Sequence, residues 1–148
     1  MATVIRDFRD LQTYRASFAA AMRIFEITKR FPPEERYSLT DQVRRSSRSE
    51  CTSQAEAWRK RRYPAAFKAK LADAMQEASE TQTRLDFALA CEYIDEDTPR
   101  ELNAEHERIL GRLNSMDMKA ESFCFRQQRL FRSTPTTQPP NHLPSSPQ

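Results

Sequence analysis

Glycine is almost absent from this chain, which has a single glycine, Gly111, among its 148 residues. Hairpin turns and phosphate-cradling loops depend on glycine, so the composition argues against a β-rich fold and against a nucleotide-binding loop. No stretch approaches about 18 consecutive apolar residues, so we expect no membrane span. The N-terminus shows no apolar core followed by a small-residue cleavage site, and we expect a cytoplasmic protein.

Cysteine and histidine are scarce and scattered. The three cysteines, Cys51, Cys91 and Cys124, form no CxxC pair; we interpret them as free buried thiols, with a disulfide or metal role as the alternative. Metal sites in helical bundles combine Glu with Glu-x-x-His pairs, but here Asn103 stands three residues before His106. We therefore predict no metal, no cofactor and no catalytic site, hence a protein that is not an enzyme.

The chain is instead rich in Ala, Glu, Arg, Gln and Leu, which favour helices. Apolar residues recur three or four positions apart in four segments, separated by short connections that contain proline or acidic residues. We expect helices from Phe8 to Arg30, from Ser38 to the Arg59–Arg62 run, from Pro64 to Tyr93, and from Thr98 to a frayed end within residues 124–132. This pattern predicts an all-α, antiparallel up-down-up-down four-helix bundle over residues 1–132.

The same spacing predicts the core and the helix starts. Ser38 to Asp41 resembles a capping box, and Thr98 followed by Pro99 is typical of an N-cap and first helical position. We expect one core that contains nine apolar residues: Leu11, Phe18, Phe25, Phe67, Leu71, Leu85, Ile109, Leu113 and Met116.

Residues 133–148 differ in composition from the rest, with five prolines among Ser, Thr and Gln. Such a segment cannot bury enough apolar surface to offset the entropy of ordering, so we predict a disordered tail. A proline-rich docking motif is the alternative, although no PxxP with a basic anchor is present.

Charge is distributed unevenly along the chain. Residues 42–70 carry nine Lys and Arg against two Glu, a net charge of +7, whereas residues 71–107 carry a net charge of −9. Arginine binds phosphate bidentately, and Trp58 and Tyr63 beside the basic run are suited to stacking on bases. We predict RNA or DNA binding through seven residues: Arg44, Arg45, Arg48, Arg59, Lys60, Arg61 and Arg62.

The alternative is that these side chains are solvated or pair with acidic groups on a neighbouring helix. The protein would then be a structural or adaptor bundle that mediates self-association or protein docking without nucleic acid.

Four motifs occur in order along the chain: FRDL at residues 8–11, FPPEERYSL at 31–39, QVRRS at 42–46 and AE at 55–56. Over about residues 7–125 they resemble the four-helix bundle family of 23S rRNA intervening-sequence proteins. The resemblance implies a bacterial protein whose family is associated with reading frames inserted in 23S rRNA genes. Relatives that accompany diversity-generating retroelements form pentamers and bind nucleic acid and reverse transcriptase; the resemblance implies no catalytic residues.

The chain departs from these motifs at several positions. Ser53 and Gln54 replace Asn-Ile, and Glu50, Lys68 and Arg84 stand where apolar residues are usual. We interpret these changes as surface that is buried in the relatives and solvated here, and so expect weaker self-association than a pentamer. Natural divergence and deliberate solubilisation would both give this pattern.

Overall fold

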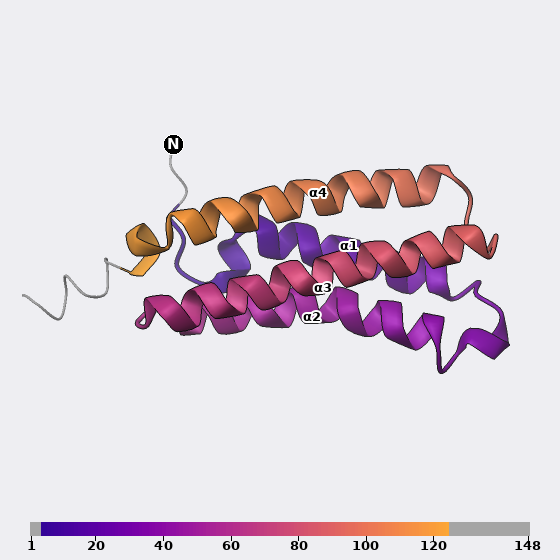
Figure 1. The fold of residues 1–148 in the computed structure, drawn as a ribbon, viewed down its shortest axis with the longest axis horizontal. Coiled ribbons are helices and arrows are strands. Elements are labelled where there is room, and N and C mark those ends of the chain that lie inside the picture. Colours follow the sequence, from indigo (N-terminus) through magenta and orange to yellow (C-terminus); the bar gives the residue numbers. More distant parts are fainter. Residues whose placement is uncertain (1–3, 125–148) are drawn as a thin grey trace, which may run out of the picture.

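Four long helices lie lengthwise beside one another in the computed structural model, which describes residues 4–124 (Figure 1). Two short 3₁₀ helices, η1 and η2, precede the first two long helices. In chain order the elements are η1 (Phe8–Asp10), α1 (Gln12–Thr28), η2 (Pro33–Glu35), α2 (Leu39–Arg59), α3 (Pro64–Ala90) and α4 (Asp97–Met118).

Each helix packs against two others, in the cyclic order α1, α2, α3, α4 and back to α1. The α2–α3 turn lies at one end of the bundle, and the α1–α2 and α3–α4 connections lie at the other end (Figure 1). The predicted all-α four-helix bundle is confirmed. None of the helices between residues 4 and 124 is long and apolar enough to cross a membrane. Helix α4 ends at Met118, before the frayed end predicted within residues 124–132, and the predicted tail, residues 133–148, lies outside the described residues.

Side chains other than the predicted ones cap α2 and α4. The hydroxyl of Ser38 donates to Glu35 Oε2 at 3.0 Å, and the same carboxylate oxygen accepts the Leu39 backbone N–H at 3.1 Å. Ser38 itself makes no side-chain cap hydrogen bond to α2. At α4, Asp95 Oδ1 accepts the Thr98 backbone N–H at 3.0 Å, and the helix begins one residue before Thr98. The two starts were correctly placed to within a residue, but their capping groups come from upstream carboxylates.

The core has three apolar clusters: two large ones with a polar layer between them, and a smaller one of Phe8, Leu11 and Trp58. One large cluster, around Ile24, Val43 and Leu85, lies toward η2, and the other large cluster, around Phe67 and Ile109, lies toward the α2–α3 turn. Most of the predicted core residues are buried: Leu11, Phe67, Leu71, Leu85, Ile109 and Leu113.

The prediction for α1 was wrong by about one position. Phe18 is 52% exposed, and Phe25 and Met116 are only half-buried. The buried face of α1 instead carries small and polar residues together with one isoleucine: Thr13, Ser17, Ala20, Ala21, Ile24 and Thr28. Small side chains let α1 approach the bundle axis, and Ser17 has a polar partner there, so the aromatic stripe faces outward.

The interpretation of Glu50 and Gln54 as solvated surface was also wrong. Their side chains are 0% and 1% exposed within a single chain, in the polar layer between the two large apolar clusters. Lys68 is exposed as expected, and Arg84 is half-buried at the α2–α3 seam. Glu50 and Gln54 therefore give no reason to expect weaker self-association; the oligomeric state stays a prediction.

Candidate nucleic-acid interface

The seven basic residues predicted to bind nucleic acid lie on α2 or in the turn that follows it, and two of them contact their own bundle. Arg44 is half-buried: its Nε donates to Thr28 Oγ1 at 2.7 Å, and its guanidinium lies 4.8 Å from the Phe25 ring centroid. Arg61 Nε donates to the Trp58 carbonyl at 2.9 Å, and its guanidinium lies 3.3 Å from the Trp58 ring. Burial lowers the pKa of Arg61. Arg44 and Arg61 therefore hold α1, α2 and the α2–α3 turn together.

The other basic residues are exposed. Arg45 forms an ion pair with Asp41 on the preceding turn at 3.7 Å, and Arg62 lies 5.8 Å from the Tyr63 ring. Arg48, Arg59 and Lys60 form no ion pair with any residue in 4–124. Arg59 still acts electrostatically on Asp7, but exposed cations that form no ion pair are open to a phosphate, so these three side chains are the best placed of the seven.

Aromatic side chains of the N-terminal segment run beside the basic edge of α2. We call Phe8, Tyr14, Phe18 and Phe25 the aromatic strip. The ring centroids of Phe8 and Tyr14 are 5.1 Å apart, and those of Tyr14 and Phe18 are 6.1 Å apart.

Arginines of α2 cover both ends of the aromatic strip. The guanidinium of Arg59 lies 5.8 Å from the ring of Phe8, and that of Arg48 lies 5.7 Å from the ring of Phe25. Such cation–π contacts position the guanidinium groups while leaving their outer edges in solvent. The sequence analysis identified these arginines but not the strip, because it placed Phe18 and Phe25 in the core.

The acidic residues concentrate elsewhere, mainly along α3 and α4. Lys70 Nζ lies 2.6 Å from Glu56 Oε2 and 3.6 Å from Asp73 Oδ2, which joins α2 to α3. Arg23 pairs with Glu101 and joins α1 to α4. These ion pairs join neighbouring helices, but none of them includes one of the seven basic residues predicted to bind nucleic acid.

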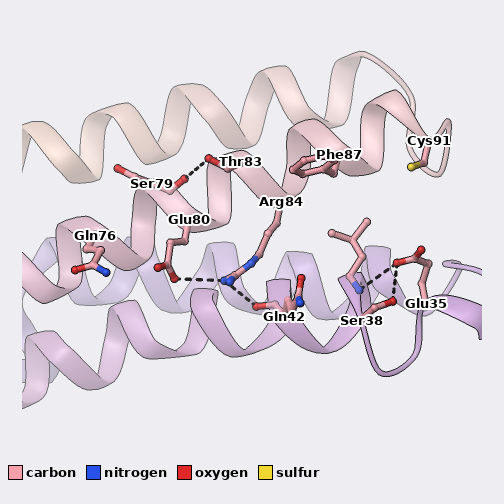
Figure 2. A pocket seen from close by; sticks show the side chains of 11 residues that line it. Glu35, Ser38, Gln42, Gln76, Ser79, Glu80, Thr83, Arg84, Phe87 and Cys91 are labelled. Atoms are coloured by element: carbon pink, nitrogen blue, oxygen red, sulfur yellow. Dashed lines mark hydrogen bonds and ion pairs between the residues drawn. The ribbon is translucent and has the colours of Figure 1, made fainter.

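A groove of about 610 Å³ follows the outer seam of α2 and α3 (Figure 2). Arg84 crosses it: its Nη1 donates to the Gln42 carbonyl at 3.2 Å and lies 3.5 Å from Glu80 Oε2. Glu35 faces the same groove, and the exposed Phe87 lines it toward the α3–α4 end. Because two carboxylates accompany one arginine, the groove is not suited to a phosphate.

The polar layer crosses the middle of the bundle and is fully buried. Gln54 Nε2 donates to Ser17 Oγ at 2.8 Å, and Thr81 Oγ1 lies 3.4 Å from Glu50 Oε2. Glu50 Oε2 is also 3.2 Å from His106 Nε2, so residues of α2 and α4 meet across the bundle. Glu50 Oε1 and Gln54 Oε1 have no hydrogen-bond partner among the described residues.

The geometry of His106 fixes where its protons lie. Its Nδ1 is 2.8 Å from the Leu102 carbonyl, which can only accept, so Nδ1 carries a proton. Nε2 and Glu50 Oε2 then need one further proton between them, because two bare acceptors at 3.2 Å would repel. The pair is therefore either an imidazolium with a carboxylate or a neutral imidazole with a carboxylic acid.

The pKa shifts of the two groups follow from this arrangement. Burial raises the pKa of Glu50, although the hydrogen bond and charge of His106 oppose the rise. Burial alone would lower the pKa of His106, but the hydrogen bond and charge of Glu50, with the Leu102 carbonyl, raise it overall. The pair thus holds its proton to a higher pH than the separate side chains would.

Within residues 4–124, no three His, Cys, Asp or Glu side chains gather to hold a metal ion. Cys51 lies beside Glu50, and burial followed by the Glu50 charge raises the pKa of its thiol to about 12. A thiol with so high a pKa is a poor nucleophile.

Comparison with known proteins places the chain in a family. Residues 9–115 match the family described as 23S rRNA-intervening sequence protein. A crystal structure of a protein of unknown function from the S23 ribosomal protein family of Bacteroides thetaiotaomicron is similar, with 27% identity and a TM-score of 0.65. The match covers 72% of this chain and 95% of that one. No curated protein matches. With most of its length matched, the chain belongs to the 23S rRNA-intervening sequence protein family.

Proposed function

We propose that this protein binds RNA or DNA through the phosphate backbone, along the edge of α2 that borders α1. The observation that carries the proposal is the set of exposed cations Arg48, Arg59 and Lys60, which form no ion pair within residues 4–124. The association of the family with 23S rRNA, in its name, supports a nucleic-acid partner.

The spacing of these cations suits a polyanion. Arg48 and Arg59 are eleven residues apart on one helix, which separates them by about 16 Å along the axis. A ligand that reaches both must carry negative charge over that length, as a nucleic-acid backbone does. Contacts to phosphate position a protein without reading sequence, so binding should be nearly independent of sequence.

Anchored neighbours keep this edge in place. Arg44 is fixed by Thr28 and Arg61 by the Trp58 carbonyl, so the two ends of α2 are tied to α1 and to the following turn. Rigid elements lose less conformational entropy on binding than flexible ones do. Arg44 and Arg61 therefore support the interface, while Arg48, Arg59 and Lys60 contact phosphate.

The alternative, an adaptor bundle without nucleic acid, has one observation in its favour. Arg44, Arg45 and Arg61 satisfy their charge or hydrogen bonds within the chain, which weakens the argument from composition alone. A test of the proposal must therefore concern the unpaired cations and not the net charge.

The test replaces Arg48, Arg59 and Lys60 together by Gln and measures binding to structured RNA and duplex DNA over a range of salt concentrations. A matched control replaces three exposed cations of α3 and α4 by Gln: Lys68, Arg100 and Arg112. Each lost phosphate contact should flatten the log–log salt slope by about 1, so we expect a change of about 3 in the first variant.

The control loses the same charge and should keep a nearly normal slope. Equal changes of the salt slope in both variants would show that binding depends on net charge alone. No binding by the unmodified protein at low salt would leave the adaptor function.

A further inference from the structure

We propose that the preferred ligand is single-stranded, and that Phe18 of α1 stacks on one of its unpaired bases while α2 arginines contact the phosphates on either side. This inference rests on the proposed function and specifies its substrate class. It comes from the aromatic strip. Phe18 is the exposed ring of the strip, and it lies between the two ends that arginines of α2 cover.

The exposure of Phe18 follows from the buried residue beside it. Ser17 takes the inward position on α1 because Gln54 donates a hydrogen bond to its hydroxyl at 2.8 Å, with both side chains buried. The helix is thereby rotated so that Phe18 points outward and is 52% exposed, with Met22 beside it 49% exposed. A large ring held open to solvent on a rigid helix is a ready stacking platform.

The basic side chains of α2 lie alongside this stacking platform. One ridge of α2 at helical spacing holds positions 44, 48, 52, 55 and 59. The contact of Arg48 with Phe25 shows that this ridge borders α1, and the contact of Arg59 with Phe8 shows that it borders η1. Neither this ridge nor positions 14, 18, 22 and 25 of α1 carries a carboxylate. Alternation of aromatic faces with cations is how proteins bind unpaired strands.

A duplex would not use the ring. Its bases are stacked on one another, and the A-form major groove is too deep and narrow for a side chain on a helix surface to enter. An unpaired strand can turn a base onto Phe18 because every base presents a π-face, which also keeps the contact tolerant of sequence.

An apolar protein partner suits the strip less well than a nucleic acid does. A protein that covered Phe18 and Met22 would also have to match the exposed guanidinium of Arg48 at one end and that of Arg59 at the other. The carboxylate nearest to the Arg59 end, Asp7, is already bonded to Arg9 at 2.8 Å. Charge complementarity therefore favours a flexible polyanion that carries flat apolar groups.

The test uses three probes with equal numbers of phosphates: an oligothymidylate, a strand of abasic residues and a duplex. Their binding is compared for the unmodified protein, Phe18→Ala and Phe18→Trp. The matched control is Phe87→Ala, because Phe87 is 60% exposed but lies in the α2–α3 groove.

We expect the unmodified protein to bind the oligothymidylate more tightly than the abasic strand or the duplex. Phe18→Ala should weaken oligothymidylate binding about fivefold or more and leave the other two probes unchanged. Phe18→Trp should preserve binding because the indole also stacks, and Phe87→Ala should have no effect. Unchanged helical circular dichroism in every variant shows that the fold is intact.

The inference is overturned, and the proposed function survives, if Phe18→Ala leaves all three probes bound as before or weakens all three equally. It is also overturned if Phe18→Ala lowers the molar mass measured by light scattering without changing binding, because a second copy would then occupy the strip. Failure of every probe to bind at low salt would instead overturn the proposed function itself.

Discussion

The buried pair of Glu50 and His106 allows the sharpest test of the bundle interior. Both side chains are fully buried, and their closest atoms are 3.2 Å apart. A buried ion pair is strongly destabilised when one partner is removed, whereas replacing both partners by apolar residues is often neutral or stabilising. We therefore consider Glu50→Leu, His106→Leu and the double variant.

The two single variants should differ in magnitude. His106→Leu leaves an isolated carboxyl group in the core and should cost about 3–5 kcal/mol at neutral pH. Glu50→Leu leaves a histidine that can stay neutral, with its Nδ1–H still bonded to the Leu102 carbonyl, and only Nε2 unpaired. That loss should cost about 1–3 kcal/mol.

The double variant should be about as stable as the unmodified protein, or more stable by about 1–4 kcal/mol. The assay is urea unfolding followed by helical circular dichroism, and the double-mutant cycle gives the coupling between the two residues. At about 4 °C per kcal/mol, melting temperatures should show the same order. A cost below about 1 kcal/mol for His106→Leu would contradict the buried pair.

Three further predictions follow from burial and charge. Because the pKa of His106 is raised by folding, its stabilisation is complete below about pH 6.5 and is lost as pH rises through the folded pKa. Urea unfolding should therefore show stability falling with pH above that value, and the double variant Glu50→Leu with His106→Leu, which removes both buried titratable groups, should lose this dependence. Leu71→Ala should lower the free energy of unfolding by about 2–5 kcal/mol, whereas Phe18→Ala should lower it by less than about 1 kcal/mol because the Phe18 ring is half in solvent. Equal losses of stability in thermal unfolding would refute the orientation of α1. Iodoacetamide should label the exposed Cys91 in the folded protein and leave the buried Cys51 unmodified until urea is added, as read by peptide mass spectrometry.

The order of the helices and the starts of α2, α3 and α4 were predictable because they depend on local signals, whereas α1 begins four residues later than predicted and α4 ends earlier. Pro64 opens α3 as expected, and the apolar spacing of α3 from Phe67 to Ala88 matches its buried face. On α3 and α4 most residues of the predicted apolar stripe face inward, although Phe87 and Met118 are exposed, so periodicity identifies most of the core.

The orientation of α1 was not predictable from its own sequence. Phe18 and Ser17 are adjacent, and hydrophobicity assigns the core position to Phe18. The structure gives it to Ser17, because the Gln54 amide on another helix needs a buried partner. A hydrogen bond between residues 37 positions apart is invisible to a local pattern.

The burial of Glu50 has the same origin. Its partner His106 lies 56 residues away, on a helix that packs diagonally opposite α2. Glu50 and His106 are polar residues at positions of α2 and α4 where the helical spacing calls for apolar ones. This coincidence was a signal for such a pair. Likewise, the anchoring of Arg44 becomes visible only when α1 is in place, because Thr28 of that helix fixes its guanidinium.

The salt dependence of nucleic-acid binding by the unmodified protein tests the central claim most directly. The affinity for a structured RNA is measured by mobility shift at several salt concentrations and plotted as log K against log salt. If Arg48, Arg59 and Lys60 neutralise about three phosphates, the slope should lie near −2 to −3, with similar values for unrelated sequences. A slope near zero, or no shift at the lowest salt, would contradict the account.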